Sequence, residues 1–214
     1  MRGHWVRLAG AWRDLRAHTR YPPMVSELLG QAAAASVLLA ATLKFRGTLT
    51  FQLQGDGAVN LLVAQCTHDF RLRAVARCDD ARLALSGDSR RGALFRQLVG
   101  TDGRVTVTIE ADEKSMRFQG VVPLAGTSLA ESLETYFASS EQLPTRVLLA
   151  ADEELGAGML VQKLPEAGAG DAEEVTAAWE AAQSGIERVS PSELLRNPVE
   201  QVLGQGFSGH DLRL

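Results

Sequence analysis

The chain has 214 residues, of which 45% are hydrophobic and 22% charged, and its formal net charge is −4. This composition supports a folded domain with its own core and excludes an intrinsically disordered chain. The basic residues are dispersed along the sequence, which argues against a nucleic-acid-binding protein, because such proteins gather Lys and Arg on one stripe.

The N-terminal part contains a short strand and the clearest helix of the chain. Residues 2–8 form the predicted strand, with Trp5 as a candidate core anchor. Residues 11–18 are expected to make a helical turn. Residues 24–44 carry apolar side chains at three- and four-residue steps, which indicates a helix. Its middle is almost entirely Ala, Leu and Val, so it should be buried, and its apolar run, 32–43, is too short to span a bilayer.

Beyond residue 47 the apolar period changes to two, which predicts a meander of antiparallel strands. The first two, 48–54 and 59–64, flank Gly55-Asp56-Gly57, whose glycines are expected to supply positive φ angles for a tight turn. A short helix is expected at 93–98. The remaining strands are predicted at 70–76, 104–110, 116–122, 145–150 and 158–163.

Capping signals predict the other helices. Ser128 and Glu131 have the spacing of a capping box, which opens a helix to about residue 139. Residues 166–171 are small and polar, as in a flexible linker. After this linker, Asp171 and Ser190 each open a helix, and a proline after Asn197 breaks and restarts the second. The predicted fold class is therefore α+β, with an antiparallel β-sheet core and packed helices in residues 1–165 and a helical arm in 166–214.

Two short stretches contain residue types that are found in ligand-binding or catalytic sites. Gly55-Asp56-Gly57 resembles a phosphate-binding loop, but a strand follows it where that site requires a helix N-terminus, so a plain hairpin is favoured. Cys66 and His68 would share one face of a strand, and a thiol nucleophile with an imidazole base is conceivable there. An ordinary buried or edge thiol is the favoured interpretation of Cys66.

The two cysteines and four histidines do not predict a metal site or a disulfide scaffold. Zinc requires three or four closely spaced ligands, and the histidines are scattered singly. Cys66 and Cys78 would be able to pair only if neighbouring strands align them, and free thiols are expected in a reducing cytosol. No signal peptide is recognised before Trp5, so a cytoplasmic location is the expectation.

The apolar sheet faces are the remaining feature, and they favour binding over catalysis. The two long predicted helices of the core cannot cover every strand. A second layer is needed, from the helical arm, from a second subunit or from another protein that binds there.

Three stretches then carry a resemblance to a known family. They read YPPMVSELLGQAAAASVLLAATLKFRGTLTFQLQGDGAVNLLVAQCTHDFRLRAVAR, FQGVVPLAGTSLAESLETYFASSEQLPTRVLLA and GAGMLVQKLP. In this order and with few gaps, the chain resembles the 33 kDa chaperonin family from about Arg2 to Val202. The resemblance implies a redox-regulated heat-shock holdase of the bacterial cytosol, which binds unfolding proteins without ATP.

The resemblance also implies a three-part architecture: an α+β core, a helical linker and a C-terminal zinc domain with four cysteines. The chain ends at Leu214, where that domain would begin, so the zinc domain is expected to be absent and no metal or other cofactor is expected in this chain. Cys66 and Cys78 match no cysteine of the family's switch. The expectation is a holdase without redox regulation, biased toward its client-binding state.

The expected partners are unfolded client proteins and a second copy of the chain, in a homodimer formed by exchange of a strand or of the arm, with neither nucleic acid nor membrane. Two alternatives stay open: a structural dimerisation module without client binding, and a thiol enzyme that uses Cys66 and His68. The candidate client-binding residues are Leu49, Phe51 and Leu53 on the sheet and Trp179, Leu194, Leu195 and Val202 on the arm.

Overall fold

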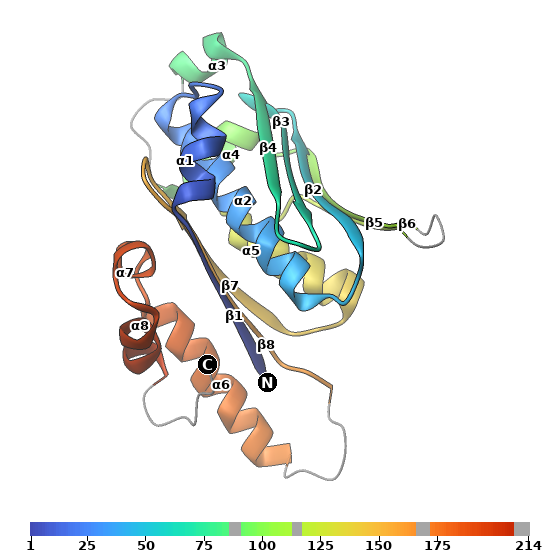
Figure 1. Cartoon of the computed structure of the whole chain (residues 1–214), viewed down its shortest axis with the longest axis vertical. Helices are drawn as coiled ribbons and strands as arrows, with labels where there is room; N and C mark the ends of the chain where they lie inside the picture. Colours follow the sequence, from blue (N-terminus) through green and yellow to red (C-terminus); the bar gives the residue numbers. More distant parts are fainter. Residues whose placement is uncertain (86–90, 113–116, 166–171, 208–214) are drawn as a thin grey trace.

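The computed structural model describes residues 1–85, 91–112, 117–165 and 172–207, and its elements stack in layers on both sides of one long helix, α2 (Pro23–Thr42) (Figure 1). On one side of α2 lies a five-stranded sheet in the order β4-β3-β2-β5-β6. On the other side lies a three-stranded sheet in the order β1-β8-β7. Three C-terminal helices cover the far face of the smaller sheet. This arrangement confirms the predicted α+β class.

The elements lie close to the predicted positions, and every strand pair is antiparallel. The strands are β1 (Arg2–Leu8), β2 (Gly47–Gly55), β3 (Val59–Thr67), β4 (Leu72–Cys78), β5 (Gly103–Ala111), β6 (Arg117–Pro123), β7 (Thr145–Ala151) and β8 (Gly156–Gln162). The other helices are α1 (Gly10–Ala17), α3 (Asp80–Leu85), α4 (Arg91–Val99), α5 (Leu129–Tyr136), the π-helix η1 (Phe137–Glu141), α6 (Ala172–Arg188), α7 (Pro191–Arg196) and α8 (Val199–Gly206).

Helix α2 is the centre of the core because small side chains let it contact both sheets. Pro23 occupies its first turn, where the missing N–H is tolerated. The Cβ atom of an alanine at Gly30 would lie 2.6 Å from the Cβ of Ala151, so only glycine permits this approach. The apolar run 32–43 is too short to span a bilayer, but the whole of α2 has the length and composition that a bilayer span requires. However, 72% of its most apolar window is buried inside this fold, as in a core helix.

The alternation of β2 places two different sets of side chains on the two faces of the five-stranded sheet. Leu49, Phe51 and Leu53 point inward toward α2 and are fully buried. The intervening Thr50 and Gln52 are only half-buried on the other face. The hydrophobic pattern therefore fixes which face of the sheet packs against α2.

The prediction of positive φ angles at Gly55 and Gly57 is wrong, because among the described glycines only Gly47, Gly100 and Gly126 adopt them. The two glycines are needed for a close approach instead. A Cβ at Gly55 would lie 1.9 Å from the Val99 carbonyl oxygen, and a Cβ at Gly57 would lie 2.4 Å from the Gly100 nitrogen. The turn is thus packed against the segment that joins α4 to β5.

Asp56, between these glycines, binds the same segment with its side chain. Its Oδ1 accepts hydrogen bonds from the backbone N–H groups of Thr101 and Asp102, each at 3.0 Å. The N–H of Asp102 is the main cause that lowers the pKa of the Asp56 carboxyl. The Gly-Asp-Gly stretch therefore joins two hairpins of one sheet and has no ligand-binding geometry.

The predicted caps of α5 and α7 form to different degrees. Ser128 caps α5 by accepting from the Glu131 N–H at 3.2 Å, but the Glu131 carboxylate binds Thr127 in place of the Ser128 N–H. At α7 both halves of the box are present between Ser190 and Glu193. The predicted linker 166–171, with its cap Asp171, lies outside the described residues.

Candidate functional site

The candidate site is the interface between the three-stranded sheet and the arm, a name used here for the described helices α6 to α8 and Phe207. The arm lies along the face of the sheet that is turned away from α2 (Figure 1). Strand β8 is buried along its whole length because both of its faces are covered. Ala157 and Met159 face the arm, whereas a Cβ at Gly158 would meet Leu38 of α2 at 2.7 Å.

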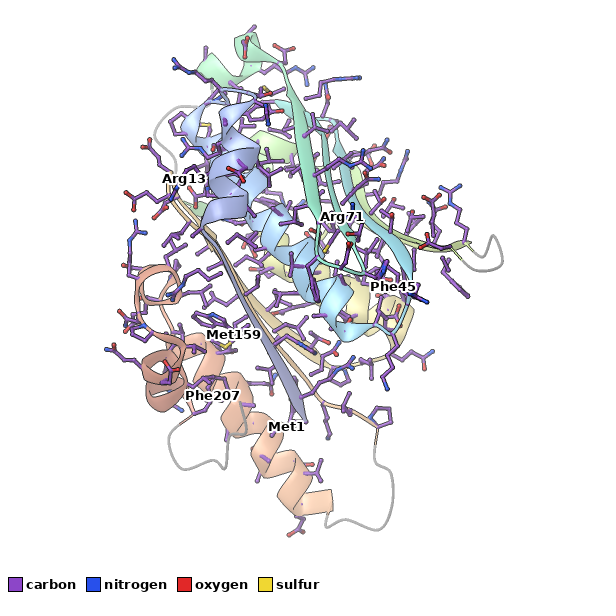
Figure 2. The ribbon with its side chains drawn as sticks, in the orientation of Figure 1. Met1, Arg13, Phe45, Arg71, Met159 and Phe207 are labelled. Carbon is purple, nitrogen blue, oxygen red and sulfur yellow. The ribbon has the colours of Figure 1, made fainter. Side chains whose placement is uncertain are left out.

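One apolar cluster fills this interface, separate from the main core around α2. Leu194 and Val202 of the arm are completely buried in it. Figure 2 shows Met159 of the sheet and Phe207 of the arm at this interface. The buried members are Ala150, Ala157, Met159 and Val161 from the sheet and Ala182, Ile186, Val189, Leu194, Leu195, Val202 and Phe207 from the arm. Burial of this kind is non-directional and favourable in proportion to the apolar area removed from water.

Arg7 of β1 provides a polar contact across the interface. One of its terminal nitrogens, Nη2, donates to the carbonyl oxygen of Leu194 at 3.0 Å and also to that of Asn197. These carbonyls lie at the C-terminal end of α7, where helices have carbonyl groups without intrahelical partners. The guanidinium also lies over the Trp5 ring, 5.2 Å from its centroid. Arg7 therefore caps α7 from the sheet.

Asp152, in the turn between β7 and β8, provides a second polar contact. Its Oδ1 accepts from the N–H groups of Glu154 and Leu155, each at 2.8 Å, which shapes the turn. Its Oδ2 binds Arg196 of α7 at 2.5 Å. The Asp152 carbonyl accepts from the Trp12 indole N–H at 2.9 Å. One short turn thus links α1, the sheet and the arm.

A cleft of about 490 Å³ lies where α6 crosses α5 and β7. Trp179 lines it together with Glu134 and Arg146, which form an ion pair at 3.0 Å. Burial is the main cause that raises the pKa of Glu134, although the Val147 N–H and Arg146 oppose it. A second cleft, of about 720 Å³, separates α7 from α2, α4 and α5. The arm is therefore not packed tightly along its whole length.

The seven candidate client-binding residues lie in two places that the fold keeps apart. Leu49, Phe51 and Leu53 are fully buried beneath α2, where no partner reaches them in this conformation. The four arm residues, Trp179, Leu194, Leu195 and Val202, meet the smaller sheet and would become accessible if the arm moved away. Their role in client binding stays a prediction. Sequence reasoning missed Arg7, Asp152 and Arg196, whose spacing carries no signal for contacts across the fold.

Cys66 and His68 do not form a catalytic pair in this structure. The Cys66 side chain faces the core and is completely buried, and its thiol donates to the Thr67 carbonyl oxygen at 3.5 Å. The His68 Nδ1 instead accepts from the Gly47 N–H at 3.2 Å. Burial, with a smaller contribution from Asp69, raises the pKa of the Cys66 thiol to about 11. Little thiolate is therefore present at neutral pH, and the thiolate is the reactive form.

Cys66 and Cys78 are both free thiols, and the register of β3 and β4 keeps them apart. Cys66 lies opposite Leu72 at one end of this pair of strands, and Cys78 lies opposite Val59 at the other end. Strand pairing therefore does not align them for a disulfide. Among the described residues, no group of three or more His, Cys, Asp or Glu side chains is arranged to hold a metal ion.

Comparison with known proteins gives a consistent family match. A family model described as Hsp33 protein matches residues 1–214. The chain is 39% identical over 215 residues to the 33 kDa chaperonin of Chromobacterium violaceum, and 39% identical over 214 residues to that of Nitrosococcus oceani. Each alignment covers the whole of this chain and 69% of the relative.

A solved structure shares the fold. The crystal structure of the 33 kDa chaperonin from Thermotoga maritima matches with a TM-score of 0.75, over 99% of this chain and 72% of that one. Its sequence identity to this chain is 22%, so this match supports a shared fold and nothing further.

Proposed function

The chain belongs to the Hsp33 family, and from this premise we propose that it is an ATP-independent holdase, a chaperone that binds unfolding proteins and prevents their aggregation. The observation that supports this proposal is the second apolar cluster, which is made by an arm packed on a sheet and not by the main core. Because apolar contacts are non-directional, a surface that the arm covers is also able to hold apolar segments of another chain.

The arm has the properties of a unit that opens locally. Two of its helices, α7 and α8, are only 6 and 8 residues long. Helices this short are marginal without packing partners. Local opening would leave the core around α2 intact, because that core is a separate cluster. Opening would expose Leu194, Val202 and the sheet residues beneath them.

We also propose that neither cysteine controls this opening. Cys66 is buried on the inner face of the five-stranded sheet, and Cys78 lies on its edge strand, so both are remote in the fold from the interface cluster. This proposal corresponds to a holdase that is not redox-regulated through the cysteines in residues 1–214. It also excludes a role for Cys66 as a nucleophile in the same activity.

Light scattering by a thermolabile enzyme, heated in reducing buffer without nucleotide, tests the proposal. We expect this chain to suppress aggregation at roughly equimolar amounts, with no change on adding ATP. The Cys66→Ser variant is the matched control, because it removes the thiol with little change in volume, and it should suppress aggregation equally well. Unchanged aggregation at a several-fold excess of the chain would contradict holdase activity. Loss of suppression only in Cys66→Ser would favour thiol chemistry.

A homodimer formed by exchange of the arm is the second part of the proposal. Exchange would preserve every contact of the interface, since the sheet of one copy would receive the arm of the other. Sedimentation velocity at micromolar concentration should show a dimer. A monomer at all concentrations would count against it. A dimer that fails to suppress aggregation would favour a structural dimerisation module without client binding.

A further inference from the structure

The five-stranded sheet has an outer face that none of the described helices covers. Helices α2, α4 and α5 all lie on its inner side, where Leu49, Phe51 and Leu53 are buried (Figure 1). The outer face is made by the alternate residues of each strand. They are Arg73, Val75 and Arg77 of β4, Leu61, Val63 and Gln65 of β3, Thr50, Gln52 and Gln54 of β2, Arg104, Thr106 and Thr108 of β5, and Gln119, Val121 and Pro123 of β6.

The strand register arranges these side chains in rows that cross the sheet. The central row is Val75, Val63, Gln52, Thr106 and Val121. Its two end valines are unusually exposed for apolar side chains, at 52% for Val75 and 53% for Val121. The central row therefore contains three valines, with the polar Gln52 and Thr106 between Val63 and Val121. We call this row the apolar stripe.

The two rows on either side of this stripe carry unpaired positive charge. Arg73 begins one row, and the other contains Arg77 and Arg104. In the part of the chain that the structure describes, none of these three arginines forms a salt bridge, and all three are exposed. Glu110, on the row beyond Arg73, is already paired with Arg117 at 3.7 Å. Beyond the other row, the exposed Asp79 and Asp102 lie at the ends of the strands. The outer face is locally basic although the whole chain has a net charge of −4.

We propose that this outer face binds extended acidic segments of polypeptide, in which carboxylates flank an apolar side chain. The proposal rests on the proposed function, because it names the class of client segment that a second surface of the chaperone would select. The spacing supports it. Arg73, Val75 and Arg77 follow one another on one side of a strand at intervals of about 7 Å. An extended segment repeats its own side chains at the same interval, so an acidic, apolar, acidic sequence on one side would match all three.

Two other occupants fit the outer face less well. A single-stranded nucleic acid would need aromatic side chains for base stacking, and none of the outer-face residues is aromatic. A second copy that packed the same face against this one would bring like charges together, which is unfavourable. An acidic peptide that lies along β4 places its carboxylates at Arg73 and Arg77 and its apolar side chain at Val75, the first residue of the apolar stripe.

Fluorescence anisotropy with a labelled peptide tests the proposal. The probe is an extended peptide in which Glu and Val alternate on one side and Ser fills the other, and its counterpart has Lys in place of Glu. The variants are Arg73→Glu with Arg77→Glu, and the milder Arg73→Gln with Arg77→Gln. The control reverses two exposed arginines that lie outside the five strands, Arg13 of α1, which is labelled in Figure 2, and Arg20 between α1 and α2.

We expect the acidic peptide to bind and the basic one not to bind. Charge reversal should weaken binding about tenfold, the Gln variant a few-fold, and the control not at all. Binding should also weaken as salt rises from about 50 mM to about 300 mM. Equal binding of both peptides, or unchanged affinity after charge reversal with circular dichroism showing a folded variant, would overturn the proposal. Tighter binding of polyuridylate than of the peptide would overturn it as well, since the face would then be a general polyanion site.

The aggregation assay separates this inference from the proposed function. If the charge-reversed variant suppresses aggregation of acidic and basic clients as well as the unaltered chain does, the holdase stands and the acidic site is contradicted. If the chain binds the acidic peptide but suppresses no aggregation, the site stands and the holdase is contradicted.

Discussion

Replacing Leu194 by Ala should release the arm without unfolding the core. The Leu194 side chain is completely buried between α7 and the smaller sheet. Large-to-small substitution at such a site costs about 2–5 kcal/mol, because transfer energy is lost and a cavity is left. The lower value corresponds to about a thirtyfold increase in the population of the open arm. Suppression of aggregation should therefore need less protein than with the unaltered chain.

Hydrogen exchange measured residue by residue checks this prediction. Amides of α6 to α8, such as the Leu194 N–H that bonds the Ser190 carbonyl oxygen at 3.0 Å, should exchange about thirtyfold faster or more. Amides of α2 should be unchanged, since α2 belongs to the other apolar cluster. Ser192→Ala is the matched control, an exposed position in the same helix. An equal acceleration in α2 would show global destabilisation and would contradict a separately opening arm.

Replacing Arg7 by Ala should weaken the same interface through its polar contacts. The carbonyl oxygens of Leu194 and Asn197 would lose their donor at the end of α7. Buried groups left without a partner cost about 1–3 kcal/mol, and the lower end applies here because water reaches this half-buried site once the side chain is gone. Arg7→Lys should give an intermediate result, because an ammonium lacks the planar fork that reaches both carbonyls.

Limited proteolysis of α7, together with its amide exchange, provides the measurement for Arg7. Arg13→Ala removes an exposed arginine of α1 and controls for the change of net charge. Cleavage of Arg7→Ala at the rate of this control would show that the contact does not hold the arm. Because Arg7 donates to the carbonyl of Leu194, the effects of Arg7→Ala and Leu194→Ala should be non-additive when the two are combined.

The Arg7 Nε is itself buried and has no partner among the described residues. The closed arm therefore leaves one buried hydrogen-bond donor unsatisfied.

The arm and the outer face are two surfaces with different chemistry. The arm covers an apolar cluster with polar contacts from Arg7 and Asp152. None of the described helices covers the outer face, in which Thr106 and Thr108 are buried, and arginines border its apolar stripe. Clients with long apolar segments would depend on arm opening, whereas acidic extended segments would not. The Leu194 and Arg73 variants therefore separate the two contributions in one aggregation assay.

The candidate site was predictable only in part, because its two halves are far apart in the chain. Leu194 and Val202 were predicted from the sequence as candidate apolar residues of the arm, and both are buried. Arg7 and Asn197 are 190 residues apart, and no local pattern pairs them. In the same way, Leu49, Phe51 and Leu53 were correctly placed on one side of β2, but that side is covered by α2 and closed to partners.

The sequence by itself determined the elements that local physics controls. The period-two alternation of β2, the apolar length of α2 and the capping box between Ser190 and Glu193 depend on residues within a few positions of one another. The family resemblance also came from these contiguous stretches. Only the tertiary structure decided the pairing of β1 with β8, more than 140 residues later, and the reason for Gly55 and Gly57, which lies in their contact with Val99 and Gly100. Such choices depend on which distant surfaces meet, and neither periodicity nor capping encodes that.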